Sequence, residues 1–127
     1  MKILPISDSR NTCETSFHND TILASCNDIR SKLDIDVACY GGDKTNFEFE
    51  LELEDGTPFT IYDWKEGDCV DEDTILYYHI GARNAVDSQK ALRALKEHGL
   101  KTQTRNDALA AMRELFGDIL NFPPAYR

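Results

Sequence analysis

The chain reads Phe47-Glu48-Phe49-Glu50-Leu51-Glu52-Leu53-Glu54, a strict alternation of apolar residues and glutamates. A repeat of two residues is the period of a β-strand, whose successive side chains point to opposite faces of a sheet. The pattern therefore predicts a strand that buries its apolar side chains in a core and presents its glutamates on the other face. Because same-face neighbours on a strand lie about 6.6–6.8 Å apart, the glutamates should form a regular row of negative charge.

The residues that follow predict an antiparallel hairpin over residues 46–64. Asp55-Gly56 is a favoured two-residue turn, and residues 59–64 have the composition of a returning strand. Residues 74–80 predict a third antiparallel strand, which Gly81 ends. Together these segments form a β-meander, in which each strand pairs with the next one along the chain.

Three other segments carry apolar residues at helical spacing. The first helix is expected to begin at Asn19 or Asp20 and to run to Leu33, because residues 22–33 repeat an apolar side chain every three or four positions. Two more are expected at residues 87–98, closed by a left-handed Gly99, and at residues 104–116. The polar residues between 7 and 18 read as a loop, and short strands are expected at 3–6 and 35–40.

This order of elements predicts one α+β domain over residues 1–127. It consists of an antiparallel β-meander, made of the hairpin 46–64 and the strand 74–80, with about three helices packed on one face. A chain of 127 residues falls within the usual size of a single domain and can bury about two-thirds of its unfolded surface.

Charge is distributed unevenly along the chain. Eleven of the 23 acidic residues lie between Glu48 and Asp73, where Lys65 is the one basic residue. This stretch therefore has a charge of −10, and the rest of the chain about +1, which gives the net charge of −9. An acidic protein with a pI near 4.7 is poorly suited to direct contact with nucleic acid or with an anionic membrane surface. It is suited to basic protein partners. The amino-terminal residues do not resemble a signal peptide and no apolar run approaches 20 residues, so a cytoplasmic location is expected.

Enzymatic chemistry and cofactor binding have no support in the sequence. The three histidines are scattered and form no recognised catalytic or metal-binding motif. The four cysteines, Cys13, Cys26, Cys39 and Cys69, include no close pair, so free thiols are expected rather than a zinc site or a disulfide framework. We therefore expect a protein that is not an enzyme and that needs no metal or cofactor.

The acidic stretch is the best candidate for a binding surface. Clustered carboxylates repel one another, and a surface that keeps them together gives up some stability. Aromatic residues beside charges, such as Trp64, are enriched at binding hot spots. The predicted partner-binding residues are Glu48, Glu50, Glu52, Glu54, Asp55, Asp63, Trp64, Asp68, Asp71, Glu72 and Asp73. The same acidic face is also compatible with a solubility role alone, since charged strands discourage edge-to-edge pairing.

The expected function is binding to a basic protein, such as a nuclease or another nucleic-acid-binding protein, whose basic groove the acidic surface would occupy. Compact, acidic, cofactor-free proteins of this kind are typical of phages and other mobile elements that block host defence, an analogy at the level of protein class. A homodimer is also compatible with the sequence, because an exposed edge strand can pair across a two-fold axis.

An alternative function is the binding of a small anion, such as a nucleotide. Tyr77, Tyr78, His79 and Arg83 surround Gly81 at a junction between a strand and a helix. A tyrosine could stack on a base, while Arg83 and the N–H groups of a helix amino terminus could receive a phosphate. The segment contains neither a Walker A motif nor a dinucleotide fingerprint.

Overall fold

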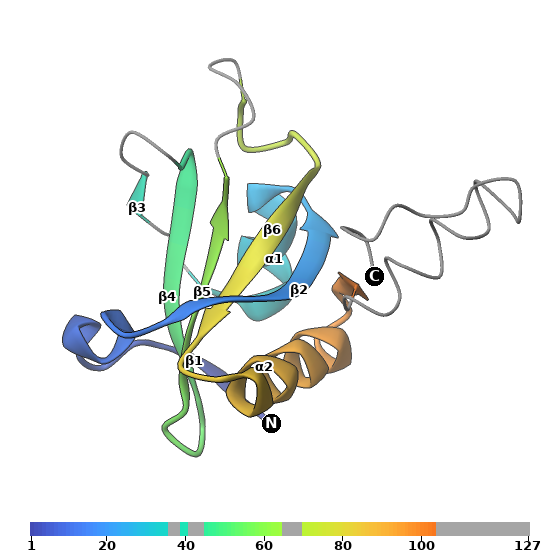
Figure 1. The fold of residues 1–127 in the computed structure, drawn as a ribbon. Helices are drawn as coiled ribbons and strands as arrows, with labels where there is room; N and C mark the ends of the chain where they lie inside the picture. Colours follow the sequence, from blue (N-terminus) through green and yellow to red (C-terminus); the bar gives the residue numbers. More distant parts are fainter. Residues whose placement is uncertain (36–38, 41–44, 65–69, 104–127) are drawn as a thin grey trace, which may run out of the picture.

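A computed structural model describes residues 1–35, 39–40, 45–64 and 70–103, and Figure 1 shows their arrangement. The described elements are β1 (Ile3–Pro5), the 3₁₀-helix η1 (Ser9–Thr12), β2 (Ser16–Ala24), α1 (Cys26–Leu33), β3 (Cys39–Tyr40), β4 (Phe47–Leu53), β5 (Pro58–Asp63), β6 (Leu76–Ala82), α2 (Ala85–Glu97) and β7 (Lys101–Gln103). The fold is α+β, as the sequence predicts.

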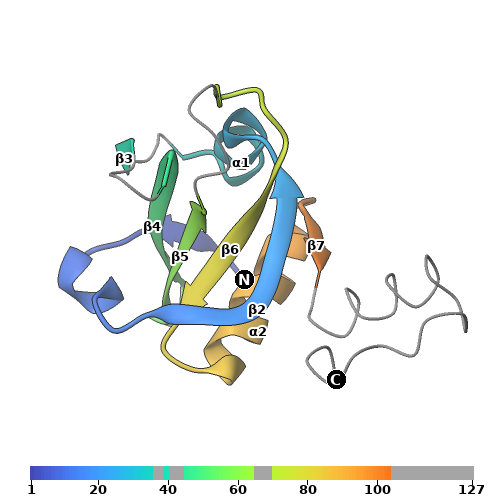
Figure 2. The same cartoon turned by 45° about the horizontal axis from the view of Figure 1, so that its top comes forward.

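The strands form one antiparallel sheet. Its order is β1-β4-β5-β6-β2-β7, and β3 pairs with the first residues of β4 on the side that β1 occupies farther along. Figure 2 shows β4, β5, β6, β2 and β7 following one another across the molecule. The predicted meander is therefore confirmed for its three central strands, β4, β5 and β6. β6 does not end at Gly81 as predicted but continues through it to Ala82, and β1 and β2 add strands from the amino-terminal part of the chain.

The two faces of the sheet differ in what covers them. One face, the core face, carries the buried side chains of the central strands, including Phe49, Ile61 and Ile80. Residues of α1 and α2 complete the same hydrophobic cluster, with Ile29 and Leu95 fully buried in it. The opposite face, which we call the open face, carries Glu48, Tyr62, His79 and Thr21, which the strand register places side by side across β4, β5, β6 and β2.

The hairpin between β4 and β5 closes where the sequence predicts, but through a three-residue loop, Glu54-Asp55-Gly56, rather than the predicted two-residue turn. Gly56 adopts a φ of 89°, a conformation that glycine reaches without strain. The Leu53 N–H donates to the Thr57 carbonyl, and the Gly56 N–H donates to the Leu53 carbonyl. Glu52 lies opposite Pro58, so the proline takes the first position of β5, where it interrupts the fewest ladder bonds.

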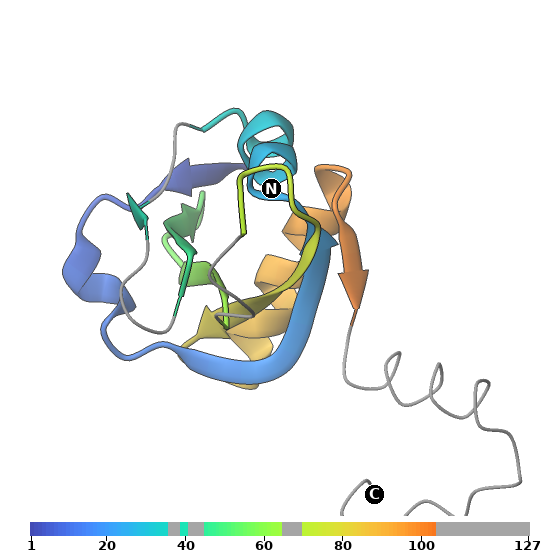
Figure 3. The same cartoon turned by 90° about the horizontal axis from the view of Figure 1, so that it is seen from above.

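The helix predicted to begin at Asn19 or Asp20 is wrong in its first part. Residues up to Ala24 belong to β2, and α1 begins only after Ser25, whose side chain caps it in a reciprocal arrangement with Asp28. Ile22 and Ala24 are buried and fit both periods, because a short apolar run cannot by itself distinguish a strand from a helix. Asn19, with a φ of 71°, marks an irregularity where β2 bends; Figure 3 shows the resulting arc.

The other helical predictions differ in outcome. α2 begins two residues earlier than predicted, capped by Asn84, and Gly99 follows its end in the left-handed conformation that the sequence predicts. The described residues therefore contain two α-helices rather than three. The helix predicted over residues 104–116 lies outside them. Of the strand predicted at 35–40, the structure describes Cys39–Tyr40 as β3.

Candidate acidic binding surface

The four glutamates of β4 form the glutamate row that the alternation predicts. Glu48, Glu50, Glu52 and Glu54 project away from the core, and none of them is buried. The apolar residues between them are almost completely inaccessible to solvent. The row begins at Glu48, the second residue of β4, and ends at Glu54, the residue that follows the strand.

Each glutamate of the row accepts a hydrogen bond from an uncharged group. The Oε1 atom of Glu48 accepts from the Thr45 hydroxyl at 2.9 Å, and that of Glu50 from the Thr12 hydroxyl at 2.8 Å. Backbone N–H groups supply the other two bonds, from Ser7 to Glu52 at 2.7 Å and from Lys2 to Glu54 at 2.9 Å. Three of the four donors lie in residues 2–12, so the amino-terminal segment runs beside the row and orients it.

These donors fix the carboxylates without cancelling their charge. None of the ion pairs found among the described residues includes a glutamate of the row; their acidic partners are instead Asp8, Asp55, Glu72, Asp87 and Glu97. A neutral donor restricts the rotamer of a carboxylate and leaves its negative charge in place. The row is therefore an ordered set of carboxylates that, among the described residues, is held by uncharged donors rather than by ion pairs.

Asp55 and Asp63 have structural partners. The Asp55 carboxylate lies 2.7 Å from Lys90 Nζ, and this ammonium group, together with Thr57, holds the pKa of Asp55 well below its usual range. Asp63 is 0% exposed and accepts hydrogen bonds from Asn46 and from the backbone N–H of Phe47. Asp63 was predicted to bind a partner, but the structure places it in the interior, because β5 alternates and turns this residue toward the core.

The acidic loop before β6 packs against α1. Glu72 pairs with Arg30 at 3.1 Å, and Asp73 accepts a hydrogen bond from the Asn27 side chain at 2.6 Å. Asp71 accepts from the Asp73 backbone N–H and from the Thr74 hydroxyl, and these bonds lower its pKa. Two of the three described acidic side chains of this loop, Glu72 and Asp73, therefore bond to side chains of α1. Asp68 lies outside the described residues.

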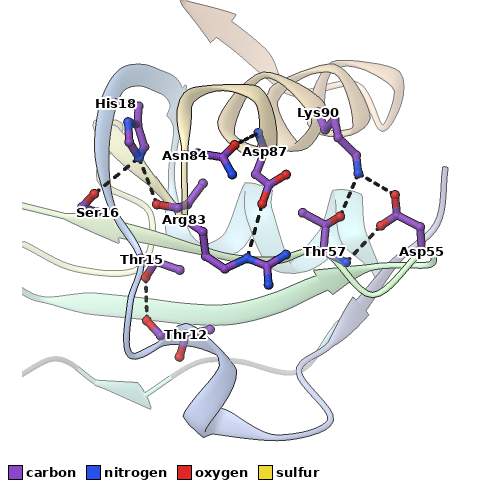
Figure 4. Close-up of polar contacts among 11 residues, drawn as sticks. Thr12, Thr15, Ser16, His18, Asp55, Thr57, Arg83, Asn84, Asp87 and Lys90 are labelled. Atoms are coloured by element: carbon purple, nitrogen blue, oxygen red, sulfur yellow. Dashed lines mark hydrogen bonds and ion pairs between the residues drawn. The ribbon is translucent and has the colours of Figure 1, made fainter.

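The residues of the alternative anion site do not converge. Tyr77 and His79 lie on the open face, whereas Tyr78 is fully buried on the core face, because successive residues of β6 alternate. Arg83 lies beyond the end of β6 and pairs with Asp87 at 3.3 Å, as Figure 4 shows. Asn84 caps this helix terminus by accepting from the Asp87 N–H, so the Arg83 side chain and the helix terminus both already have partners within the chain.

Sequence reasoning missed an aromatic cluster on the open face. The ring of His79 stacks on Phe17, with 4.2 Å between ring centroids, and meets the edge of Tyr62 at 5.5 Å. Phe17 falls in the segment read as a loop, so its presence on the sheet had no signal in the sequence. The alternation of Tyr62 with Ile61 and Asp63 was a usable signal, because it places Tyr62 on the same face as Glu48.

Comparisons with known proteins give no assignment: no family model, no curated protein and no solved structure matches this chain. Within residues 1–35, 39–40, 45–64 and 70–103, no helix is long and apolar enough to cross a membrane. In the same ranges, no three His, Cys, Asp or Glu side chains gather into a group that could hold a metal ion.

Proposed function

We propose that this chain is a non-enzymatic binding protein whose glutamate row occupies a basic, nucleic-acid-binding surface of a protein partner. The observation that supports the proposal is the state of the row itself. Its four carboxylates are held in place by uncharged donors and have no cationic partner in the described part of the chain. A basic groove would supply cations for these carboxylates.

The mechanism is competition without chemistry. Carboxylates arranged at regular intervals attract Lys and Arg side chains from a distance and accelerate encounter with a basic surface. Once bound, the row prevents phosphate groups from reaching those cations. The row has already given up rotamer freedom through its intramolecular hydrogen bonds, so less side-chain entropy is lost on binding. Inhibition of a host nuclease by a protein of a phage or another mobile element would suit this mode of action.

The surface we assign is smaller than the predicted one. It comprises Glu48, Glu50, Glu52 and Glu54, with Trp64 beyond the end of β5. The carboxylates of Asp55 and of the loop residues Asp71, Glu72 and Asp73 are already bonded within the fold. Asp63 is excluded by its burial.

The test is an affinity purification from a nuclease-treated lysate of the native host, followed by a competition assay. The bait is the wild-type chain, beside Glu48→Gln/Glu50→Gln and a control, Glu14→Gln/Asp34→Asn, that removes the same charge at two exposed positions outside the row. We expect the wild type and the control to retain a basic protein at low salt, and the row variant to lose it. The retained protein should bind nucleic acid, and added wild-type chain should displace that nucleic acid.

Two results would contradict the proposal. Equal retention by both double variants would show that net charge, rather than the row, attracts the partner. A retained protein whose nucleic-acid binding is unchanged by the chain would exclude occlusion. An empty purification, combined with a rise in melting temperature on adding a nucleotide that Arg83→Ala abolishes, would favour the small-anion function instead.

A further inference from the structure

The open face carries an aromatic platform beside the glutamate row. We define this platform as Phe17, Tyr62, Trp64, Tyr77 and His79. Three of its members are large side chains with unusual exposure: Trp64 at 55%, Tyr77 at 48% and Phe17 at 39%. Single exposed apolar residues are common on proteins, but several aromatic residues on one sheet face are typical of a binding surface.

The strand register explains how the platform meets the row. Glu48 on β4 lies opposite Tyr62 on β5, and Tyr62 lies opposite His79 on β6. Neighbouring strands are about 4.8 Å apart, so the backbones of Glu48 on β4 and His79 on β6 are about 10 Å apart. Burial and the charge of Glu48 both raise the pKa of Tyr62, as expected if the carboxylate lies close to the ring.

A second line of the platform lies one step farther along the strands. Asp63, the last residue of β5, pairs with Tyr78, and Trp64 follows it directly beyond the strand; on β6 the neighbouring Tyr77 lies opposite Leu23 of β2. The two lines together place aromatic residues on or next to three neighbouring strands, with the carboxylate of Glu48 opposite Tyr62. The platform is partly fixed, because His79 is held by stacking on Phe17.

We propose that the aromatic platform and the glutamate row together bind arginine side chains of the partner, in preference to lysine. A guanidinium group is planar, stacks on Trp and Tyr, and pairs with a carboxylate through two parallel N–H groups, whereas an ammonium group does neither as well. The inference rests on the proposed function and specifies its partner. Single-stranded nucleic acid also stacks on aromatic residues, but the neighbouring carboxylates would repel its phosphates.

The test compares two synthetic peptides of equal charge, hexa-arginine and hexa-lysine, each fluorescently labelled. Their binding is followed by anisotropy at fixed ionic strength. Trp64 is the one tryptophan of the chain, so its emission reports independently whether a ligand reaches the platform. We expect hexa-arginine to bind about fivefold more tightly than hexa-lysine, a ratio that corresponds to one or two stacking contacts, and to change the Trp64 emission.

Variants separate the two halves of the surface. Tyr77→Ala should lower the affinity for hexa-arginine to the value for hexa-lysine, and the affinity for hexa-lysine should not change. Glu48→Gln/Glu50→Gln should lower the affinity for both peptides. The control is Val86→Ala, which removes an apolar side chain of 68% exposure on α2, away from the open face, and should change neither affinity. Thermal unfolding of each variant confirms that the fold is intact.

The outcomes distinguish this inference from the proposed function. Equal affinity for the two peptides, with loss of both in the glutamate variant, would overturn the arginine preference and leave the proposed function standing. Failure of both peptides to bind would reject the proposed function as well. Binding of labelled oligo(dT) at physiological salt would also reject both, because it would show that the platform accepts nucleic acid directly.

Discussion

The carboxylate of Asp63, at the end of β5, is bonded on both of its oxygens by Asn46, the residue before β4. Oδ1 accepts from the Asn46 backbone N–H and Oδ2 from its side-chain amide, each at 2.7 Å. The Phe47 N–H also donates to Oδ1, at 2.9 Å. A buried carboxylate with three donors is stable only because each donor offsets part of its lost hydration. This contact therefore fixes where the glutamate row begins.

Replacing Asp63 should destabilise the whole domain. Asp63→Ala would leave two backbone N–H groups without an acceptor in the interior, and we expect the free energy of unfolding to fall by about 2–4 kcal/mol. Urea denaturation followed by circular dichroism measures this change. Glu14→Ala is the matched control, because it removes one acidic side chain from an exposed position, and it should shift stability by less than about 0.5 kcal/mol. A similar small shift in Asp63→Ala would contradict the structural role.

Gly81 of β6 lies directly opposite Thr60 of β5. A Cβ atom at this position would overlap Thr60 Oγ1 and crowd Tyr62. We expect Gly81→Ala to cost about 1–3 kcal/mol of unfolding free energy, as overpacked sites do. Thr60→Ala removes the obstructing hydroxyl, so the double variant should be more stable than the sum of the single effects predicts. Strict additivity in this double-mutant cycle would show that the two residues do not touch.

Tyr78 is fully buried, and its hydroxyl has no hydrogen-bond partner among the described residues. A buried polar group without a partner opposes folding, so Tyr78→Phe should raise the free energy of unfolding by about 1–2 kcal/mol. Tyr77→Phe is the matched control on the exposed side of the same strand and should have almost no effect. Chemical denaturation of both variants provides the comparison, and a loss of stability in Tyr78→Phe would indicate that the hydroxyl is bonded after all.

Stability should decrease at alkaline pH because of Cys26. Burial raises the pKa of this thiol to about 11, whereas an unfolded cysteine loses its proton near ~8.5. Between these values the folded state binds the proton and the unfolded state does not, so stability falls as pH rises, by up to about 1.4 kcal/mol per pH unit. Unfolding curves between pH 7.5 and 10 measure the slope.

Cys26→Ala should flatten that slope even though the smaller side chain lowers stability at every pH. Cys13→Ala provides the control, because Cys13 is exposed. It should keep the slope of the wild type. An unchanged slope in Cys26→Ala would assign the alkaline loss of stability to other groups, of which Tyr78 is the nearest candidate, since burial raises its pKa as well.

The glutamate row should itself reduce stability. Two unit charges about 6.7 Å apart repel by about 0.6 kcal/mol even in water, and the row contains consecutive pairs at this spacing. Glu48→Gln/Glu50→Gln/Glu52→Gln keeps an oxygen that can accept each intramolecular hydrogen bond, so we expect stability to rise by about 1 kcal/mol at low salt. The gain should shrink near 1 M salt, where the screening length falls to about 3 Å. A destabilised triple variant would mean that the charges contribute to the fold.

The parts of the fold that could be predicted are those with a local signal. β4 and the place of its hairpin were predictable because alternation over eight residues and the nearby Gly56 are local signals. The turn type was not, because Leu53 pairs with Thr57 and the loop therefore has three residues rather than two. β2 was not, because its apolar residues fit two periods and its partners, β6 and β7, lie far away in sequence. Tertiary pairing decided between strand and helix there.

The candidate site shows the same division. The glutamate row follows from the pleat of one strand, so its position was predictable. Its donors were not: Thr12 reaches Glu50 across 38 residues and Ser7 reaches Glu52 across 45. Asp63 was assigned to the surface because charge alone places a carboxylate outside, whereas the parity of β5 places this one inside.

The pairing of β2 has a consequence for the order of folding. Leu23 in β2 pairs with Tyr77 of β6 on one side and with Lys101 of β7 on the other, so both of its neighbours are synthesised much later. The β4–β5 hairpin, by contrast, closes over a few residues and can form early. As the chain leaves the ribosome, β2 is therefore synthesised before either of its partner strands, and both of its edges stay unpaired while the hairpin forms. Unpaired strand edges are sites where nascent chains aggregate. The irregularity at Asn19, which bends the waiting strand, makes it a poorer template for another chain.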